Sequence, residues 1–150
     1  MTSFEDAKGR KVVDLVSAET VGKVKDFVVD PATRSVVALI LKKTKSGDTL
    51  TWADLAGFGP DAVTVQGVDT ITEATGPVDA LLGKDHQLMG KRVLSTDGVE
   101  LGQVCDVEFD PDNGAVTSVL LEDGPPGSPR SVEGGRLVGV GSYAVVVQAE

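Results

Sequence analysis

Aromatic residues, cysteine and histidine are scarce in this sequence, and each scarcity removes a class of structure or chemistry. Aromatic residues make up 4% of the 150 residues, so Val, Leu, Ile and Ala have to build most of the core. The single cysteine, Cys105, permits no disulfide bond within the chain, and we expect a reducing, cytoplasmic compartment. The single histidine, His86, has no cysteine or second histidine nearby, so the usual zinc ligand set is missing.

Long apolar runs are also missing. The longest clean run covers residues 36–41, whereas a membrane helix needs about 20 apolar residues. Residues 1–6 lack the basic and then apolar pattern of a signal peptide. We therefore expect no membrane insertion.

The chain has fewer basic than acidic residues, and this difference is larger in its second half. The net charge of the chain is −9. Residues 1–75 carry nine basic and eleven acidic residues, whereas residues 76–150 carry five basic and twelve acidic residues. An acidic surface repels phosphate backbones, so direct binding of nucleic acid is not expected, least of all for the second half.

The chain does contain an internal repeat. Residues 22–31 (GKVKDFVVDP) align without a gap with residues 102–111 (GQVCDVEFDP), at an offset of 80. Flanking segments align in the same order at offsets of 81 and 82, namely 9–12 with 90–93 and 55–59 with 137–141. Self-similarity at a fixed spacing is the signature of a duplicated structural unit. We divide the chain into repeat one (1–68), a linker (69–88) and repeat two (89–150).

Each repeat predicts a β-hairpin. The turns are residues 30–34 (DPATR) and 110–114 (DPDNG), whose Asp and Pro residues favour a tight turn between antiparallel strands. The expected strands are 23–29 with 35–42, and 103–109 with 115–122. Arg34 stands where repeat two has Gly114, so it would be strained if that position has a positive φ.

Two further features concern the strands of the hairpin. Val24 and Val104 are out of phase with the apolar residues that follow them, and a β-bulge near Lys25 and Asp26 would restore the phase. Residues 36–41 are apolar on both faces, which is typical of a strand covered on both sides. We expect the barrel interior on one side, and the other repeat or another chain on the other side.

In the linker, residues 76–83 permit a short helical turn, because Pro77 stands near its start and Gly83 at its end.

The repeated string Gly-x-Val-x-Asp-(Val/Phe)-x-(Val/Phe)-Asp-Pro, with its upstream Gly-Lys/Arg-x-Val and downstream Leu-x-Gly-x-Gly, resembles the PRC-barrel family. The resemblance covers nearly the whole chain, twice. It implies an all-β fold of two small, mostly antiparallel β-barrels in tandem, related by a pseudo-two-fold axis. In this family the module is mostly an assembly or docking unit. The resemblance also implies an alternative, a ribosome- or RNA-maturation factor of the RimM type.

Residues that resemble catalytic or metal-binding groups have simpler structural explanations. The acidic residues Asp26, Asp30, Asp106 and Asp110 lie in or beside the predicted turns and lack the ligand loop of an EF-hand. Cys105 lies in an apolar strand and is expected to pack as a small hydrophobic residue. The Gly-x-Gly segments at 57–59 and 139–141 lack the rest of a phosphate-binding motif and are interpreted as turns. We predict no catalytic residues, cofactor or metal.

The best candidate for partner binding is a basic and aromatic group in repeat one that repeat two lacks. Its residues are Lys42, Lys43, Lys45, Trp52 and Phe58. Aromatic residues are enriched at the centres of protein interfaces, although Trp52 is more typical of a core position. The leading hypothesis is a non-enzymatic docking module that binds a protein partner or a second copy of itself. A small-ligand or metal-binding barrel is a further alternative, although so small a barrel leaves little room inside.

Overall fold

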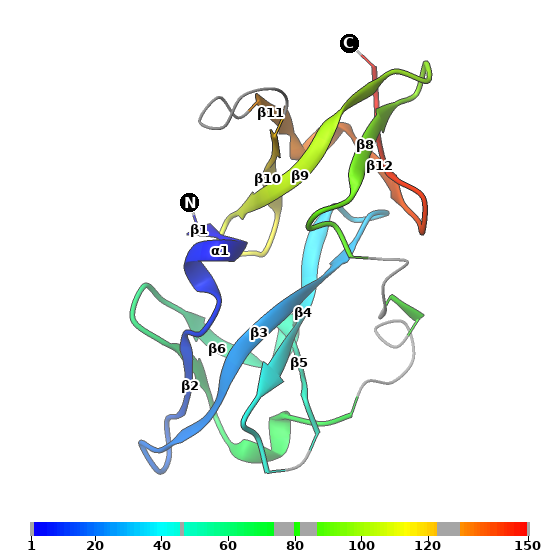
Figure 1. Cartoon of the computed structure of the whole chain (residues 1–150). Coiled ribbons are helices and arrows are strands. Elements are labelled where there is room, and N and C mark those ends of the chain that lie inside the picture. The colour runs from blue at the N-terminus through cyan, green and yellow to red at the C-terminus, as the bar shows by residue number, and fades with distance from the viewer. Residues whose placement is uncertain (1, 46, 74–79, 82–86, 123–129, 150) are drawn as a thin grey trace.

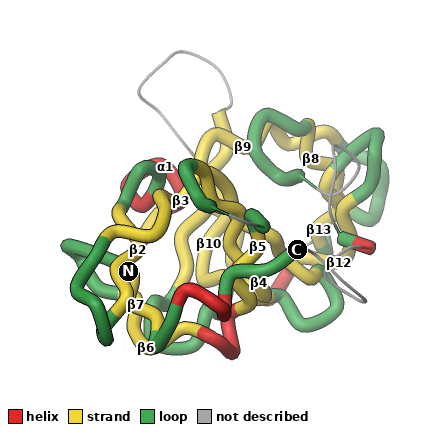
Figure 2. The backbone as a smooth tube through the Cα atoms, turned by 90° about the horizontal axis from the view of Figure 1, so that it is seen from below, coloured by secondary structure: helices red, strands yellow, loops and turns green. Residues whose placement is uncertain are grey.

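The computed structural model describes residues 2–45, 47–73, 80–81, 87–122 and 130–149. Strands dominate these residues, and the helical segments are short (Figure 2). No helix among them is long and apolar enough to cross a membrane. His86 and most of the linker segment expected to form a helical turn lie outside the described residues.

Repeat one forms a curled six-stranded sheet with the order β5-β4-β3-β2-β7-β6. Its elements are β2 (Lys11–Asp14), β3 (Thr20–Asp30), β4 (Ser35–Lys42), β5 (Thr49–Thr51), the 3-10 turn η1 (Trp52–Asp54), β6 (Leu55–Phe58), β7 (Val63–Val65) and η2 (Val68–Thr70). The pairings are antiparallel except between β2 and β7, which run parallel.

Repeat two builds the same sheet, with the order β11-β10-β9-β8-β13-β12. Its elements are β8 (Arg92–Ser95), β9 (Glu100–Phe109), β10 (Val116–Glu122), β11 (Arg130–Glu133), η4 (Gly134–Arg136), β12 (Leu137–Val140) and β13 (Val145–Val147). Strand β13 runs parallel to β8, as β7 does to β2. The all-β tandem fold predicted from the sequence is therefore confirmed. Neither sheet is closed by hydrogen bonds between its two edge strands, so each barrel is open along one seam.

The hairpins and their bulges follow the sequence pattern. The register of β3 against β4 shifts between Val24 and Asp26, which leaves Lys25 as the extra residue. In repeat two the shift leaves Cys105, the equivalent residue, in the same place. Asp30 and Asp110 each accept a hydrogen bond at 2.9 Å from the backbone N–H two residues later, as their predicted turns require. Arg34 adopts a φ of 56° where Gly114 adopts 79°, so the expected left-handed arginine is present.

The two hairpins meet at a junction with pseudo-two-fold symmetry. The Val36 N–H donates to the Gly114 carbonyl at 2.8 Å, and the Val116 N–H donates to the Arg34 carbonyl at 2.9 Å. These two bonds are exchanged by the 80-residue offset and flank a bridge between Ser35 and Ala115. Figure 1 shows the two barrels on either side of this junction, with their other ends facing away from each other. We call those ends the outer ends.

The N-terminal segment of repeat one lies on repeat two. Strand β1 (Thr2–Ser3) pairs with β9, and the short helix α1 (Phe4–Ala7) follows it at the junction (Figure 1). Ser3 caps this helix by accepting a hydrogen bond from the Asp6 N–H at 3.2 Å. The side chain of Phe4 is only 2% exposed and stacks on Phe27, with ring centroids 4.2 Å apart. The N-terminal segment therefore seals the two barrels into one shared core.

Strand β4 has buried residues on both faces, although Val37 and Ile40 of the apolar run are only half-buried. Leu39 and Leu41 belong to the shared core. Val28 and Ala38, a pair across β3 and β4, are almost fully buried although they lie outside that core cluster. At the Val36 end of the strand, the other barrel contacts β4 at the junction, where the Val36 N–H donates to the Gly114 carbonyl.

Candidate functional site

The five residues predicted as a partner-binding group separate into two places. Lys42 is the last residue of β4 and Lys43 and Lys45 follow it, and all three are exposed. Trp52 and Phe58 are half-buried and stack on each other with ring centroids 5.6 Å apart. The structure therefore places the lysines and the aromatic residues in different environments.

Trp52 and Phe58 belong to an aromatic cluster at the junction. Both rings make edge contacts with Phe109 of repeat two, at centroid distances of 6.1 and 5.4 Å. Phe4 and Phe27 also contact the Phe109 ring, at centroid distances of 5.8 and 5.4 Å. Phe109 is fully buried at the centre of this aromatic cluster, which holds the two repeats together.

The lysines instead border a hollow at the outer end of barrel one. Lys43 and Lys45 line it together with Val68, and its other lining residues are Asp14, Glu19, Thr20 and Val21. Asp14 is buried and accepts a hydrogen bond from the Val16 N–H at 2.8 Å. Leu15 and Val16, in the turn beside it, are large hydrophobic residues with exposed fractions of 49% and 80%. This end therefore combines the cationic Lys43 and Lys45 with the acidic Asp14 and Glu19 and with apolar surface.

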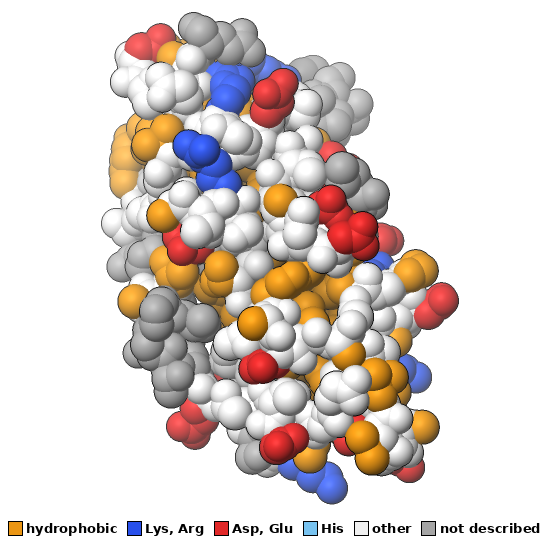
Figure 3. Space-filling view, turned by 180° about the vertical axis from the view of Figure 1, so that it is seen from behind, with side chains coloured by type: hydrophobic (Ala, Val, Ile, Leu, Met, Phe, Trp, Pro, Cys, Tyr) orange, Lys and Arg blue, Asp and Glu red, His pale blue; other side chains and the backbone are white. Residues whose placement is uncertain are grey.

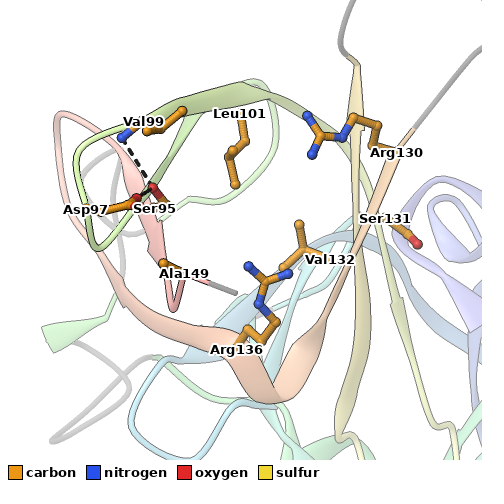
Figure 4. A pocket seen from close by; sticks show the side chains of 9 residues that line it. All are labelled: Ser95, Asp97, Val99, Leu101, Arg130, Ser131, Val132, Arg136 and Ala149. Carbon is orange, nitrogen blue, oxygen red and sulfur yellow. Dashed lines mark hydrogen bonds between the residues drawn. The ribbon is translucent and has the colours of Figure 1, made fainter.

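The outer end of barrel two carries the corresponding hollow, with a volume of about 260 Å³. Figure 4 shows its lining residues arranged around the opening: Ser95, Asp97, Val99, Leu101, Arg130, Ser131, Val132, Arg136 and Ala149. Ser95, Val99 and Leu101 are the counterparts of Asp14, Glu19 and Val21, so the two hollows occupy the same end of the two barrels. Here the cationic side chains are the guanidinium groups of Arg130 and Arg136.

The other residues considered for chemistry are engaged in structure. Asp26 and Asp106 each accept a hydrogen bond at 2.8 Å from the next residue's N–H. Gly59 and Gly141 close the tight turns before β7 and β13 by donating their N–H groups to alanine carbonyls at 3.0 Å. Burial, followed by the nearby charges of Glu122 and Asp106, raises the pKa of the Cys105 thiol above its ordinary value. These positions therefore have structural explanations that invoke no ligand.

A comparison with known protein families agrees with the duplicated topology. The sequence model of the PRC-barrel domain matches residues 1–67 and again residues 83–149. This chain belongs to the PRC-barrel family. The resemblance predicted from the repeated motif is confirmed in both repeats of this PRC-barrel protein. No protein with a curated description matches the chain.

Sequence reasoning missed the two hollows and the N-terminal segment at the junction. The hollows form where residues from several strands and loops meet, and no single stretch of sequence marks them. Phe4 did carry a signal, because it is the only aromatic residue before Phe27 and directly follows Ser3, a residue suited to cap a helix.

Proposed function

We propose that this PRC-barrel protein is a non-enzymatic docking module of the cytoplasm, which binds acidic segments of protein partners at its outer ends. One observation carries the proposal. Both outer ends place a pair of cationic side chains beside apolar surface, Lys43 and Lys45 on barrel one and Arg130 and Arg136 on barrel two. Figure 3 shows blue side chains near both ends of the molecule.

The charge of the whole chain makes this placement informative. With a net charge of −9, the chain as a whole repels acidic partners, so attraction has to come from local cationic sites. Apolar surface beside these sites, such as Val68 with 46% exposure and Val99 with 53%, supplies the hydrophobic contact that a protein partner offers. The same acidity disfavours RNA, so a role of the RimM type has less support.

Photo-cross-linking in the native host tests this function. A photoreactive amino acid replaces Lys43 or Ser131 at the outer ends, or the exposed Asp61 in the turn between β6 and β7 as a control. We expect discrete protein adducts, either with a partner or with a second copy, from the outer ends and not from Asp61. Adducts with ribosomal RNA, or equal and diffuse labelling from all three positions, would contradict the docking proposal.

A further inference from the structure

The outer end of barrel one is covered by its own chain. After β7, residues 67–72, which we call the cover segment, form the turn η2 and then meet the outer edge of β5, where Thr72 bridges to Thr49. The Thr49 N–H donates to the Thr72 carbonyl, and the Thr72 N–H donates to the Thr49 carbonyl, both at 2.9 Å. Ile71 of the cover segment is 3% exposed and belongs to the shared core. One added strand residue and one buried aliphatic side chain therefore cover the outer edge of β5.

Among the described residues, barrel two presents the same edge without a cover. Ser131 is the counterpart of Thr49. It pairs with Leu120 in β10, and Thr49 pairs with Ile40, the residue equivalent to Leu120, in β4. Thr49 is 1% exposed beneath the cover segment, whereas Ser131 is exposed. Strand β11 is the edge of its sheet, and no residue in the described part of the chain pairs with its outer side. The backbone groups of Ser131 therefore face outward beside the hollow.

The lining of this hollow suits a peptide that carries both apolar and acidic residues. Val99, Leu101 and Val132 form apolar lining, and Figure 4 shows the guanidinium groups of Arg130 and Arg136 at its side. Arg136 donates its Nε and Nη2 groups to the Gln148 carbonyl at 2.8 and 2.6 Å, so it contributes mainly its positive charge. Arginine beside a sheet edge attracts the carboxylates of an added strand and forms strong, charge-assisted hydrogen bonds with them. The cover segment of barrel one has this composition, since Asp69 precedes Ile71 and Glu73 follows it.

We propose that the outer end of barrel two binds an extended acidic peptide, which adds as a strand to the free edge of β11 and places an aliphatic side chain in the hollow. Strand addition to a sheet edge is an established mode of peptide recognition, with backbone bonds supplying affinity and a side-chain pocket supplying specificity. This inference rests on the proposed docking function and names its ligand class. The cover segment is the intramolecular example of the same contact.

The direct test uses a peptide with the sequence of residues 67–73 (GVDTITE), blocked at both ends. It is titrated into the ¹⁵N-labelled full chain, and amide shifts are followed by NMR. We expect saturable shifts at Leu101, Ser131 and Val132, and no change at Thr49, whose edge is already occupied. Replacing the isoleucine of the peptide by aspartate is expected to weaken binding about tenfold or more, because the buried side chain is lost.

Two substitutions in the protein separate the backbone and charge contributions. Ser131→Pro removes the outward N–H that the peptide needs, at an edge position where proline is compatible with the strand, and we expect it to abolish binding. Arg130→Glu is expected to weaken binding of the acidic peptide up to about fivefold. It should have little effect on the binding of a peptide that carries Asn and Gln in place of Asp and Glu. Lys25→Glu, at the exposed bulge of β3 and away from both hollows, is the matched control and is expected to leave binding unchanged.

Several results would overturn the inference. These are the absence of saturable binding, shifts confined to barrel one, equal binding of the aspartate peptide, or inorganic phosphate that produces the same shifts and displaces the peptide. The last result would identify a simple anion site. If the peptide fails while Lys43 or Ser131 still cross-links to a discrete protein, the docking function stands and only its ligand class is wrong.

Discussion

The two repeats share one fold but differ where they face each other and where they face solvent. At the junction, a large residue of one repeat meets a small residue of the other. Trp52 packs against Gly114, whereas the residue of repeat two equivalent to Trp52 is Gly134. Arg34, the residue equivalent to Gly114, donates its Nε to the Leu137 carbonyl at 2.8 Å. A Cβ atom on Gly134 would overlap the Val116 backbone, so repeat two has no room for a tryptophan there.

The differences at the junction favour pairing between the two unlike repeats. The backbone bonds of the junction are symmetric and would permit either repeat to pair with its own copy. The side chains are complementary only between unlike repeats, because Trp52 needs Gly114 and Arg34 reaches Leu137. Divergence at the junction therefore favours pairing within one chain, and divergence at the outer ends gives the two barrels different surfaces.

The largest expected effect comes from removing the ring at the centre of the aromatic cluster. Phe109→Ala should lower the free energy of unfolding by about 3–5 kcal/mol, because the ring is fully buried among four others. Val29→Ala, at the equivalent position of repeat one, should cost less, since a smaller side chain is lost. Urea denaturation of both variants measures the difference, and a larger loss for Val29→Ala would contradict the central place given to Phe109.

The covered end of barrel one offers the next test. Ile71→Ala should cost about 2–5 kcal/mol, because it empties a buried position in the shared core. Hydrogen exchange should also show lost protection of the Thr49 amide, which bonds to the cover segment. Val68→Ala, at a half-exposed position of that segment, is the control and should change stability by about 0.5 kcal/mol or less. Similar losses for both variants would mean that Ile71 does not close the barrel.

Two alanine substitutions, one in each repeat, test the asymmetry of the junction. Gly114→Ala should cost about 1–3 kcal/mol, since its φ is 79° and the new Cβ would lie 2.9 Å from the Val36 carbonyl oxygen. Arg34→Ala keeps the left-handed backbone and loses mainly one hydrogen bond, so it should cost about 1 kcal/mol. Thermal unfolding of the two variants compares them, and equal effects would argue against the packing of Trp52 on Gly114.

The smallest effect concerns the bulge residue, which is Cys105 in repeat two and Lys25 in repeat one. The raised pKa of the Cys105 thiol leaves less thiolate at pH 8 than an ordinary cysteine has, and the thiolate is the reactive form. Labelling with a thiol reagent should therefore be several-fold slower in the native protein than in urea. Equal rates in the two states would show that the thiol is neither shielded nor perturbed.

The sequence predicted the features that depend on local pattern. The repeat, the hairpin turns, the bulge at Lys25 and the left-handed Arg34 all follow from residue type and spacing, because turns and bulges are decided by a few adjacent residues. The parallel pairing of β2 with β7 and the crossing of Phe4 onto repeat two depend on contacts between distant segments. Periodicity carries no information about such contacts.

The candidate site was less predictable for the same reason. Trp52 and Phe58 were grouped with the lysines because they are close in sequence, but η1 directs the chain from β5 into β6 and the rings meet Phe109. Arg130 and Arg136 carried no signal, since nothing in the sequence shows that β11 and η4 border a hollow at the end of a barrel.

Scanning calorimetry of the full chain tests the central claim, that two repeats share one core through the junction. If Phe4, Trp52 and Phe109 bind the barrels into one cooperative unit, a single transition should appear, with equal calorimetric and van't Hoff enthalpies. Two resolved transitions, or a calorimetric enthalpy well above the van't Hoff value, would show that the barrels unfold independently and would contradict the account.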